Sequence, residues 1–209
     1  MKPVPKLIFS IFVLILISSG IWTWIWLKSN QSGNGKSLPA YATLSDFSLV
    51  DQNNDPISLK TFNGKIWIAD FIFTRCAGPC PILSSHMQRM QGMLSHSPEV
   101  VLVSFSVDPE YDTPEVLAKY ASTFGAEKDK WFFLTGDREV IFDIARSSLK
   151  LSVESETEIA PIIHSTRFVL IDEKGGLRGY YDSNEDGFMN ELISDVRILL
   201  NEKQLKLAQ

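Results

Sequence analysis

The sequence predicts an α/β domain preceded by a single transmembrane helix. Two observations lead to this prediction. A strongly apolar, uncharged stretch lies close to the N-terminus, and beyond it apolar β-rich segments alternate with segments of helical pattern. Such alternation favours a sheet covered by helices. About 170 residues follow the apolar stretch, which is enough for one domain with a substantial core.

The predicted transmembrane helix covers residues 7–27, which include no charged residue. At 1.5 Å per residue, a helix of this length crosses a hydrocarbon core of roughly 30 Å. Three tryptophans lie near its C-terminal end and two lysines precede it. The positive-inside rule therefore places residues 1–6 in the cytoplasm and the rest of the chain outside. A cleaved signal peptide is the alternative, but the first alanine for a small-residue cleavage pattern is Ala40.

Residues 28–40 are polar and rich in Gly, Ser and Asn, which predicts a flexible tether leading to a domain at 41–209. All 25 acidic residues lie beyond position 40, whereas four of the 20 basic residues lie before it, so the domain is acidic. Phosphate contacts need clustered Lys and Arg, so we expect no nucleic-acid partner. An acidic domain suits a cationic cargo or a basic partner, although a solvated acidic face is the commoner explanation.

The domain is expected to begin with a β-hairpin, in which segments 47–50 and 57–59 flank the turn sequence DQNND. Segment 66–73 is nearly all apolar, which predicts a strand buried on both faces. Pro81 favours the start of a helix that continues to about residue 95. Segment 100–107 is a second apolar strand.

Two capped helices and a short strand follow. The sequence Asp-Thr-Pro-Glu at 112–115 is typical of a helix start, and this helix is expected to end near residue 124. Segment 131–134 predicts a short strand. Asp137 is expected to cap a helix that ends near residue 147.

The chain is expected to close with a β-hairpin and a helix. Segments 166–171 and 177–181 flank the turn sequence DEKGG, and the last helix covers about 190–205. Strand–helix units followed by a closing hairpin and a final helix are the plan of the thioredoxin-like fold. The predicted fold is therefore thioredoxin-like with an additional N-terminal β-hairpin.

The chain has two cysteines, Cys76 and Cys80, in the sequence FTRCAGPCP. They follow the strand at 66–73, and the carboxyl end of a strand is where α/β folds place ligand sites. The N-terminus of the next helix lowers thiol pKa values, and the charge of Arg75 is expected to do the same. A C-x-x-x-C pair can hold one soft metal ion or close into a disulfide, and a copper site needs a third ligand from elsewhere.

A structural disulfide is the alternative interpretation of the pair in an exported domain. A bridge across three intervening residues closes a very small loop, so it constrains the unfolded chain little. The chemical interpretation is therefore favoured over the structural one.

His164 lies just before the predicted strand at 166–171, and one histidine in that place indicates little by itself. Its weight changes because three segments, DFIFTRCAGPCP, VSFSVDPEYDTPEVLAKY and IIHSTRFVLIDEKG, together resemble the three signatures of the Sco/SenC family. Its members are membrane-anchored copper chaperones for cytochrome c oxidase assembly. Three ordered motifs are far more specific than one. The matching residues are Phe71, Thr74, Cys76, Cys80 and Pro81, then Ser106, Val107, Asp108, Pro109, Asp112, Thr113 and Pro114, and finally His164 and Ser165.

The resemblance implies that Cys76, Cys80 and His164 bind one copper ion, as Cu(I), Cu(II) or both. Asp108 is a candidate for tuning the site, with capping of the turn before Pro109 as the alternative. The spacer between the cysteines departs from the family, since relatives often carry an acidic residue there and this chain has Ala-Gly-Pro. This departure changes the charge and stiffness of the loop and leaves the three ligands in place.

The resemblance also implies partners and a location. The expected partner is the copper-containing subunit of a terminal oxidase, which receives copper or has its own cysteines reduced, with other copper donors or thiol reductants upstream. This role requires no enzymatic turnover. We expect a bacterial plasma membrane, with the domain on its outer side, because no Arg- and Ser-rich transit leader precedes the apolar stretch.

Other residues with chemical potential are expected to be structural. Met87, Met90 and Met93 recur at helical spacing, which is more often core packing than a copper site. His86 and His96 belong to the same predicted helix and are expected on the surface.

Segment 182–187 resembles the first half of a calcium loop. Its twelfth position, where calcium needs a bidentate Glu, is Ile193. A polar turn is therefore predicted there.

Three other functions compete with the copper chaperone. A membrane-tethered thiol-disulfide oxidoreductase would attack with Cys76 and resolve with Cys80, and would not need His164. A peroxiredoxin is disfavoured because Ala69 and Phe73 occupy its Pro and Thr positions. A non-catalytic interaction module is disfavoured by the ordered motifs.

Overall fold

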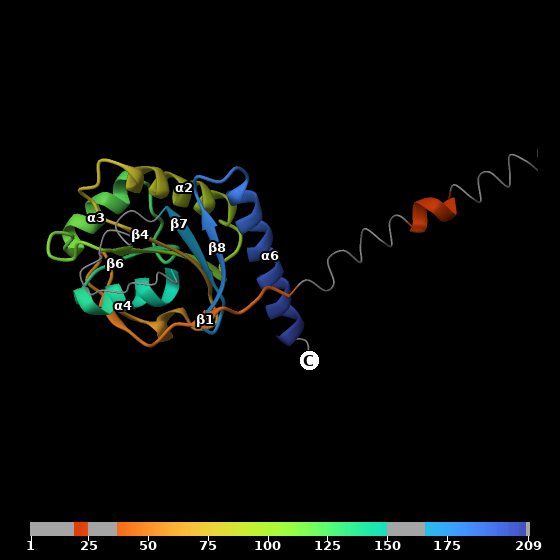
Figure 1. The fold of residues 1–209 in the computed structure, drawn as a ribbon, viewed down its shortest axis with the longest axis horizontal. Helices are drawn as coiled ribbons and strands as arrows, with labels where there is room; N and C mark the ends of the chain where they lie inside the picture. Colours follow the sequence, from red (N-terminus) through yellow and green to blue (C-terminus); the bar gives the residue numbers. More distant parts are fainter. Residues whose placement is uncertain (1–18, 25–36, 150–165, 208–209) are drawn as a thin grey trace, which may run out of the picture. The chain divides into compact units, whose positions relative to one another are not determined.

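The computed structural model describes residues 19–24, 37–149 and 166–207 of the 209-residue chain. Leu38–Gln209 forms one compact unit around a six-stranded sheet with the strand order β1-β8-β7-β4-β5-β6 (Figure 1). Helices cover both faces of this sheet, which confirms the predicted thioredoxin-like class.

Three parallel strands form one half of the sheet, from its centre to one edge. β4 (Ile66–Ile72) pairs with β5 (Val100–Ser106), and β5 pairs with β6 (Trp131–Leu134). Every residue of β4 and β5 is buried. Strands that carry helices on both faces lose the apolar–polar alternation, which is why these segments were nearly continuous in apolar residues.

The other half of the sheet is antiparallel. β7 (Arg167–Ile171) pairs with β4, β8 (Gly176–Asp182) pairs with β7, and β1 (Ala42–Thr43) pairs with β8. The closing hairpin is thus confirmed. Its turn contains Gly175 at φ +80°, a conformation that L side chains rarely adopt. β1 was not predicted, because two residues carry no periodicity.

A separate hairpin precedes the main sheet. β2 (Ser48–Val50) and β3 (Pro56–Ser58) pair antiparallel, as predicted, and the short 3-10 helix η1 (Leu59–Phe62) follows. Phe47 and Leu49 bury their side chains in the core on one face of the main sheet.

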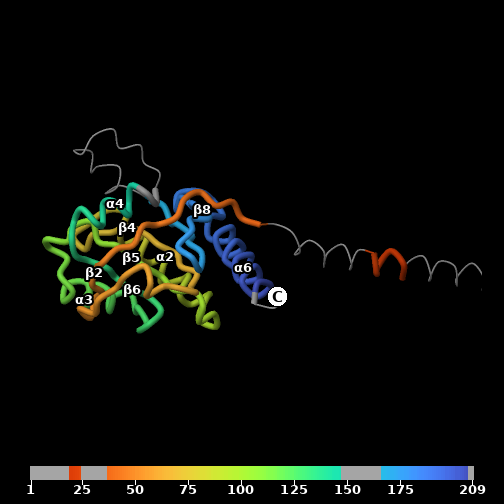
Figure 2. Tube along the Cα trace, turned by 90° about the horizontal axis from the view of Figure 1, so that it is seen from below, coloured from red at the N-terminus to blue at the C-terminus, as the bar shows by residue number. Residues whose placement is uncertain are grey.

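The four long helices divide between the two faces. α2 (Pro79–Met93), α3 (Pro114–Thr123) and α6 (Phe188–Leu207) pack on one face, and α4 (Arg138–Leu149) packs on the other. Figure 2 shows α6 beyond β8 at one end of the sheet and α3 near β6 at the other. Because β4 and β5 run parallel, the loops after them lie at the same edge of the sheet, where α2 and α3 begin.

Two of the predicted helix caps are present. The Thr113 hydroxyl accepts a hydrogen bond from the Val116 N–H at the start of α3. The Asp137 carboxylate accepts from Glu139 N–H and Val140 N–H at the start of α4. Each side chain satisfies backbone donors that have no partner inside the helix.

The start of α2 differs from the prediction. This helix begins at Pro79, after Gly78, rather than at Pro81. Both prolines fit the first turn, where a backbone N–H would have no intrahelical partner. As a result Cys80 lies inside the first turn of the helix and not in the loop before it.

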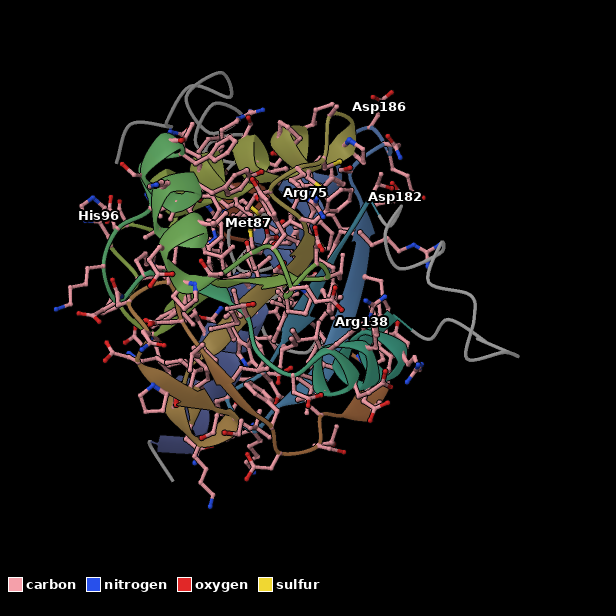
Figure 3. All side chains as sticks on the ribbon, turned by 90° about the vertical axis from the view of Figure 1, so that its left-hand side faces the viewer. Arg75, Met87, His96, Arg138, Asp182 and Asp186 are labelled. Atoms are coloured by element: carbon pink, nitrogen blue, oxygen red, sulfur yellow. The ribbon has the colours of Figure 1, made fainter. Side chains whose placement is uncertain are left out.

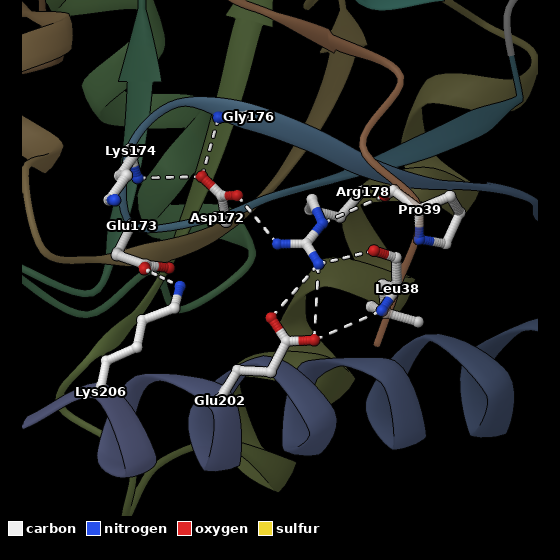
Figure 4. Close-up of polar contacts among 9 residues, drawn as sticks. All are labelled: Leu38, Pro39, Asp172, Glu173, Lys174, Gly176, Arg178, Glu202 and Lys206. Atoms are coloured by element: carbon white, nitrogen blue, oxygen red, sulfur yellow. Dashed lines mark hydrogen bonds and ion pairs between the residues drawn. The ribbon is translucent and has the colours of Figure 1, made fainter. Parts of the chain in front are cut away.

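Where the chain enters the compact unit, it is held by a buried arginine. Arg178 donates hydrogen bonds from Nη2 to the Leu38 carbonyl (2.7 Å) and from Nε to the Pro39 carbonyl (3.1 Å). The same guanidinium pairs with Asp172 (3.0 Å) and Glu202 (3.2 Å), as Figure 4 shows. Leu38 and Pro39 belong to the stretch 28–40, for which the sequence predicts a tether.

Most of the predicted transmembrane helix at 7–27 lies outside the described residues. The structure describes 19–24 of this stretch, and these residues are helical. Within the described ranges, the structure contains no helix that is both long enough and apolar enough to cross a bilayer.

Candidate metal centre

The two cysteines are free thiols at the junction between β4 and α2. Cys76 is partly buried, and Cys80 is 1% exposed. The Cys76 sulfur accepts a hydrogen bond from the Gly78 N–H at 3.4 Å. It thus lies against the backbone directly before the helix that contains Cys80, at whose N-terminal boundary Gly78 stands.

The pKa values of the two thiols shift in opposite directions. Burial raises the pKa of Cys76, but the backbone and thiol of Cys80 and the Gly78 N–H outweigh it and hold the pKa below its ordinary value. Burial raises the pKa of Cys80 to about 12, and the neighbouring Cys76 adds to the increase. Cys76 is thus the more acidic thiol of the pair, and the thiolate is the form that binds metal or attacks a disulfide.

A buried carboxylate lies in β4 on the side of the sheet that carries α2. Asp70 is 0% exposed, and neither of its oxygens has a hydrogen-bond partner within the described residues. Burial raises the pKa of Asp70 to about 7, and the Ser104 hydroxyl on the neighbouring strand offsets this only in part. The Asp70 charge also contributes to the raised pKa of Cys80.

Arg75 is paired away from the cysteine beside it. Its guanidinium donates to one Asp108 oxygen from Nη2 (2.6 Å) and Nε (3.1 Å), and it lies 4.2 Å from the centre of the Tyr111 ring. Figure 3 marks its position among the side chains. Arg75 was expected to lower the pKa of Cys76, but the hydrogen bonds named above lower it instead.

Asp108 itself was considered for tuning the site or for capping a turn. Its carboxylate faces Arg75, while its backbone carbonyl closes the turn by accepting from the Tyr111 and Asp112 N–H groups. Its influence on a bound metal stays a prediction.

A second aspartate from the same loop holds the segment before Cys76. Asp112 is 0% exposed, and its carboxylate accepts from the Thr74 N–H (3.1 Å), the Thr74 hydroxyl and the Ser106 hydroxyl. The loop after β5 is therefore joined directly to the loop that carries Cys76.

His164 lies outside the described residues, so its place relative to the thiols stays a prediction. Across 19–24, 37–149 and 166–207, no group of three His, Cys, Asp or Glu side chains is arranged to hold a metal ion. Of the three proposed ligands, the structure describes the two thiols.

The methionines and other histidines differ from one another in burial. Met87 and Met90 are fully buried, as predicted, whereas Met93 is 51% exposed. His96 is exposed, as predicted. His86 was expected on the surface, but it is half-buried, with its ring edge-to-face against Phe188 (Figure 3 labels Met87 and His96).

The segment at 182–187 is a polar turn. The Asp182 carboxylate accepts hydrogen bonds from the Asn184 backbone N–H (3.0 Å) and the Thr166 hydroxyl (2.8 Å). The Asp182 carboxylate thus bonds to the turn and to the neighbouring strand end, and the polar turn agrees with the prediction.

Two site residues had not been singled out for the roles they have. Asp70 is the one acidic residue within the apolar run IWIADFIF, and a charged residue in a buried strand is the pattern that marks it. Asp112 was expected only as part of the helix start at 112–115, of which Thr113 makes the cap while Asp112 faces inward to Thr74.

A pair of free thiols at the start of the helix after β4 identifies a thioredoxin-like protein with a dithiol at the carboxyl end of a central strand. The family profile described as SCO1/SenC matches residues 35–201. The chain belongs to the SCO1/SenC family, as its three motifs had indicated.

Individual relatives agree with this assignment. The SCO1 protein homolog of Bacillus subtilis is 34% identical over 161 residues, which are 76% of this chain and 83% of the relative. The structure of BsSco, described as a cytochrome c oxidase assembly protein with a disulfide switch, is 33% identical with a TM-score of 0.65. The match covers 78% of this chain and 96% of that one. Arabidopsis thaliana ScoI with copper bound is 27% identical with a TM-score of 0.59, over 75% of this chain and 99% of that one.

Proposed function

We propose that this protein is a copper-binding assembly factor for cytochrome c oxidase, in which Cys76, Cys80 and His164 bind one copper ion as cargo. The observation that supports this most directly is the pair of free thiols at the start of α2, one of which has a lowered pKa. Thiolate and imidazole ligands suit copper, and Cu(I) in particular. The family assignment and the copper-bound relative support the choice of metal.

The exposure of the two sulfurs suits a site that both takes up and releases its ion. Cys76 is partly exposed and Cys80 is buried beneath it. A partner can therefore approach the copper from the side of Cys76, while Cys80 holds it from within. A third ligand from the segment that contains His164 would complete a three-coordinate site.

The location proposed for this activity is the outer side of a bacterial plasma membrane. The uncharged stretch at 7–27 would anchor the chain, with residues 1–6 in the cytoplasm and the domain at 41–209 outside. In this arrangement the domain works beside the copper-containing subunit of the oxidase.

The experiment that tests the function uses cells whose own copy of the gene is deleted. Wild type, Cys76→Ser, Cys80→Ser and His164→Ala are each expressed, and the copper content and activity of cytochrome c oxidase are measured in membranes. We expect all three variants to lose most of the oxidase activity, and His96→Ala, an exposed histidine outside the site, to retain it. Normal oxidase copper with the cysteine variants would contradict the proposal.

A second candidate function is thiol reduction of the client subunit, and the unequal pKa values of the two thiols favour it. In this reaction the Cys76 thiolate attacks a client disulfide and forms a mixed disulfide. Cys80 then displaces the client thiol and leaves the Cys76–Cys80 disulfide. An added membrane-permeable reductant should restore oxidase activity to the cysteine variants if this function dominates, and added copper should do so to His164→Ala if copper delivery does.

A further inference from the structure

We propose that Asp112 is a positioning residue for the thiol pair. Its buried carboxylate fixes the segment that leads into Cys76, and so sets the separation and orientation at which Cys76 and Cys80 act. This inference deepens the proposed function and rests on the thiol pair being its site.

Among the described residues, the side-chain hydrogen bonds of Asp112 lead to the cysteine loop or to the strand beside it. One oxygen accepts from the Thr74 N–H and the Ser106 hydroxyl, and the other accepts from the Thr74 hydroxyl. The Ser106 hydroxyl oxygen in turn accepts from the Asp108 N–H at 3.2 Å. Asp112 is therefore the shared acceptor for the two loops that follow β4 and β5.

Only two peptide bonds separate this anchor, at Thr74, from the first cysteine. Thr74 precedes Cys76 by two residues, and the Cys76 N–H donates to the Phe73 carbonyl at 3.2 Å, which closes a tight turn over this stretch. Arg75, between them, is tied to Asp108 on the outer side. Two aspartates of one loop thus hold two consecutive residues, Asp112 from the interior and Asp108 from the surface.

The chemistry of a buried carboxylate makes this anchor sensitive to a single atom. Its donors are two hydroxyls and one amide N–H, all uncharged, and an ionised carboxylate accepts at both oxygens. In Asp112→Asn an NH₂ group replaces one of these oxygens. If it faces the Thr74 N–H, two donors meet, and if it faces the Thr74 hydroxyl, that hydroxyl must turn to accept from it. In either case the set of hydrogen bonds that holds this segment changes.

Movement of this segment alters both reactions open to the thiols. Groups that orient metal ligands from outside the first ligand shell typically change metal affinity by about 10- to 100-fold when they are lost. Formation of the Cys76–Cys80 disulfide depends on the effective concentration of one sulfur at the other, which falls when the loop that holds Cys76 loosens.

The test compares full-length wild type, Asp112→Asn, Thr74→Val and Thr74→Ser in detergent solution. Asp51→Asn is the matched control, because Asp51 is another buried carboxylate that accepts backbone N–H groups, here from Asn53 and Asp55 within its own turn. Urea unfolding gives the stability of each variant.

Two further measurements report on the thiols. The first is the equilibrium with oxidised glutathione, in which the two thiols lose two electrons and two protons and form one S–S bond, while the glutathione S–S bond is reduced to two thiols. The second is copper affinity by competition with a chromophoric chelator. The glutathione equilibrium needs no copper, so it tests the positioning role even if the copper function is wrong.

We expect Asp112→Asn and Thr74→Val to lower the glutathione equilibrium constant by about threefold to tenfold and copper affinity by about tenfold or more. Thr74→Ser keeps the hydroxyl, so its glutathione equilibrium constant and copper affinity should stay close to those of wild type. Asp51→Asn should lose stability, while its glutathione constant and copper affinity stay within about twofold of wild type. If Asp112→Asn lowers stability but leaves the glutathione constant within twofold, as Asp51→Asn does, Asp112 is merely structural and the inference is wrong.

Discussion

The sulfur of Cys76 accepts a hydrogen bond from the backbone N–H of Gly78 at 3.4 Å, directly before the helix that contains Cys80. A three-residue spacer allows this arrangement because the helix already begins at Pro79. The Cys76 sulfur gains hydrogen bonding in its charged form, whereas Cys80 is buried. Two chemically identical thiols thereby acquire opposite pKa shifts.

The first prediction concerns the order of thiol modification. In the reduced, copper-free protein at pH 7.5, Cys76 should react with iodoacetamide faster than Cys80 by about tenfold or more, because the thiolate is the reacting form. Peptide mass spectrometry after timed quenching measures both rates. Faster modification of Cys80 would contradict the opposite pKa shifts of the two thiols.

The second prediction separates Arg75 from the pKa of Cys76. Because the Arg75 charge is paired with Asp108, Arg75→Ala should change the Cys76 alkylation rate at pH 7 by less than about threefold. Asp108→Asn leaves the guanidinium unpaired next to the thiol, and should increase the rate more than Arg75→Ala changes it. A large fall in rate with Arg75→Ala would show that Arg75 activates the thiol after all.

The third prediction is a pH dependence of stability caused by Asp70. Its pKa is 3.8 when exposed and about 7 when buried in the fold, so between these values the folded state binds more protons than the unfolded state. The free energy of unfolding therefore falls as pH rises from 4 to 7, by up to about 4 kcal/mol for a shift of this size, and is level above.

Asp70→Asn cannot ionise and should lack this fall. Relative to wild type, the variant should gain stability between pH 4.5 and pH 8 in urea unfolding. Identical pH profiles for the two proteins would mean that Asp70 is not a buried acid of raised pKa.

The fourth prediction concerns the buried arginine shown in Figure 4. Arg178→Met leaves Asp172 and Glu202 without their cation and the Leu38 and Pro39 carbonyls without a donor, so it should cost about 3–5 kcal/mol of stability. Lys206→Met is the matched control, because its pair with Glu173 is more exposed and should cost about 0–1 kcal/mol. Urea unfolding measures both, and equal small effects would contradict a stabilising role for the network.

The sequence predicted the regular elements well where the physical pattern was local. The strand at 131–134 and the hairpin of β2 and β3 were predicted close to their observed bounds. Caps at Thr113 and Asp137 follow from side chains that bond the backbone a few residues away. The pairing of β1 with β8 could not be predicted, because it depends on contact between segments more than 130 residues apart.

The site was predictable as a set of residue types but not as an arrangement. The motifs identify Cys76 and Cys80, yet the hydrogen bond to the sulfur of the first and the burial of the second depend on where α2 begins. The inward direction of Asp112 depends in the same way on the fold, since its partners come from a different loop. His164 was found through the family motif alone.

The central claim is that Cys76, Cys80 and His164 bind one copper ion. The most direct measurement is an anaerobic titration of the reduced full-length protein with Cu(II), comparing wild type with Cys76→Ala, His164→Ala and the control His96→Ala. The account predicts one equivalent bound, with thiolate-to-copper absorption that Cys76→Ala abolishes, His164→Ala weakens and His96→Ala leaves unchanged. The absence of stoichiometric copper, or a spectrum indifferent to His164, would contradict it.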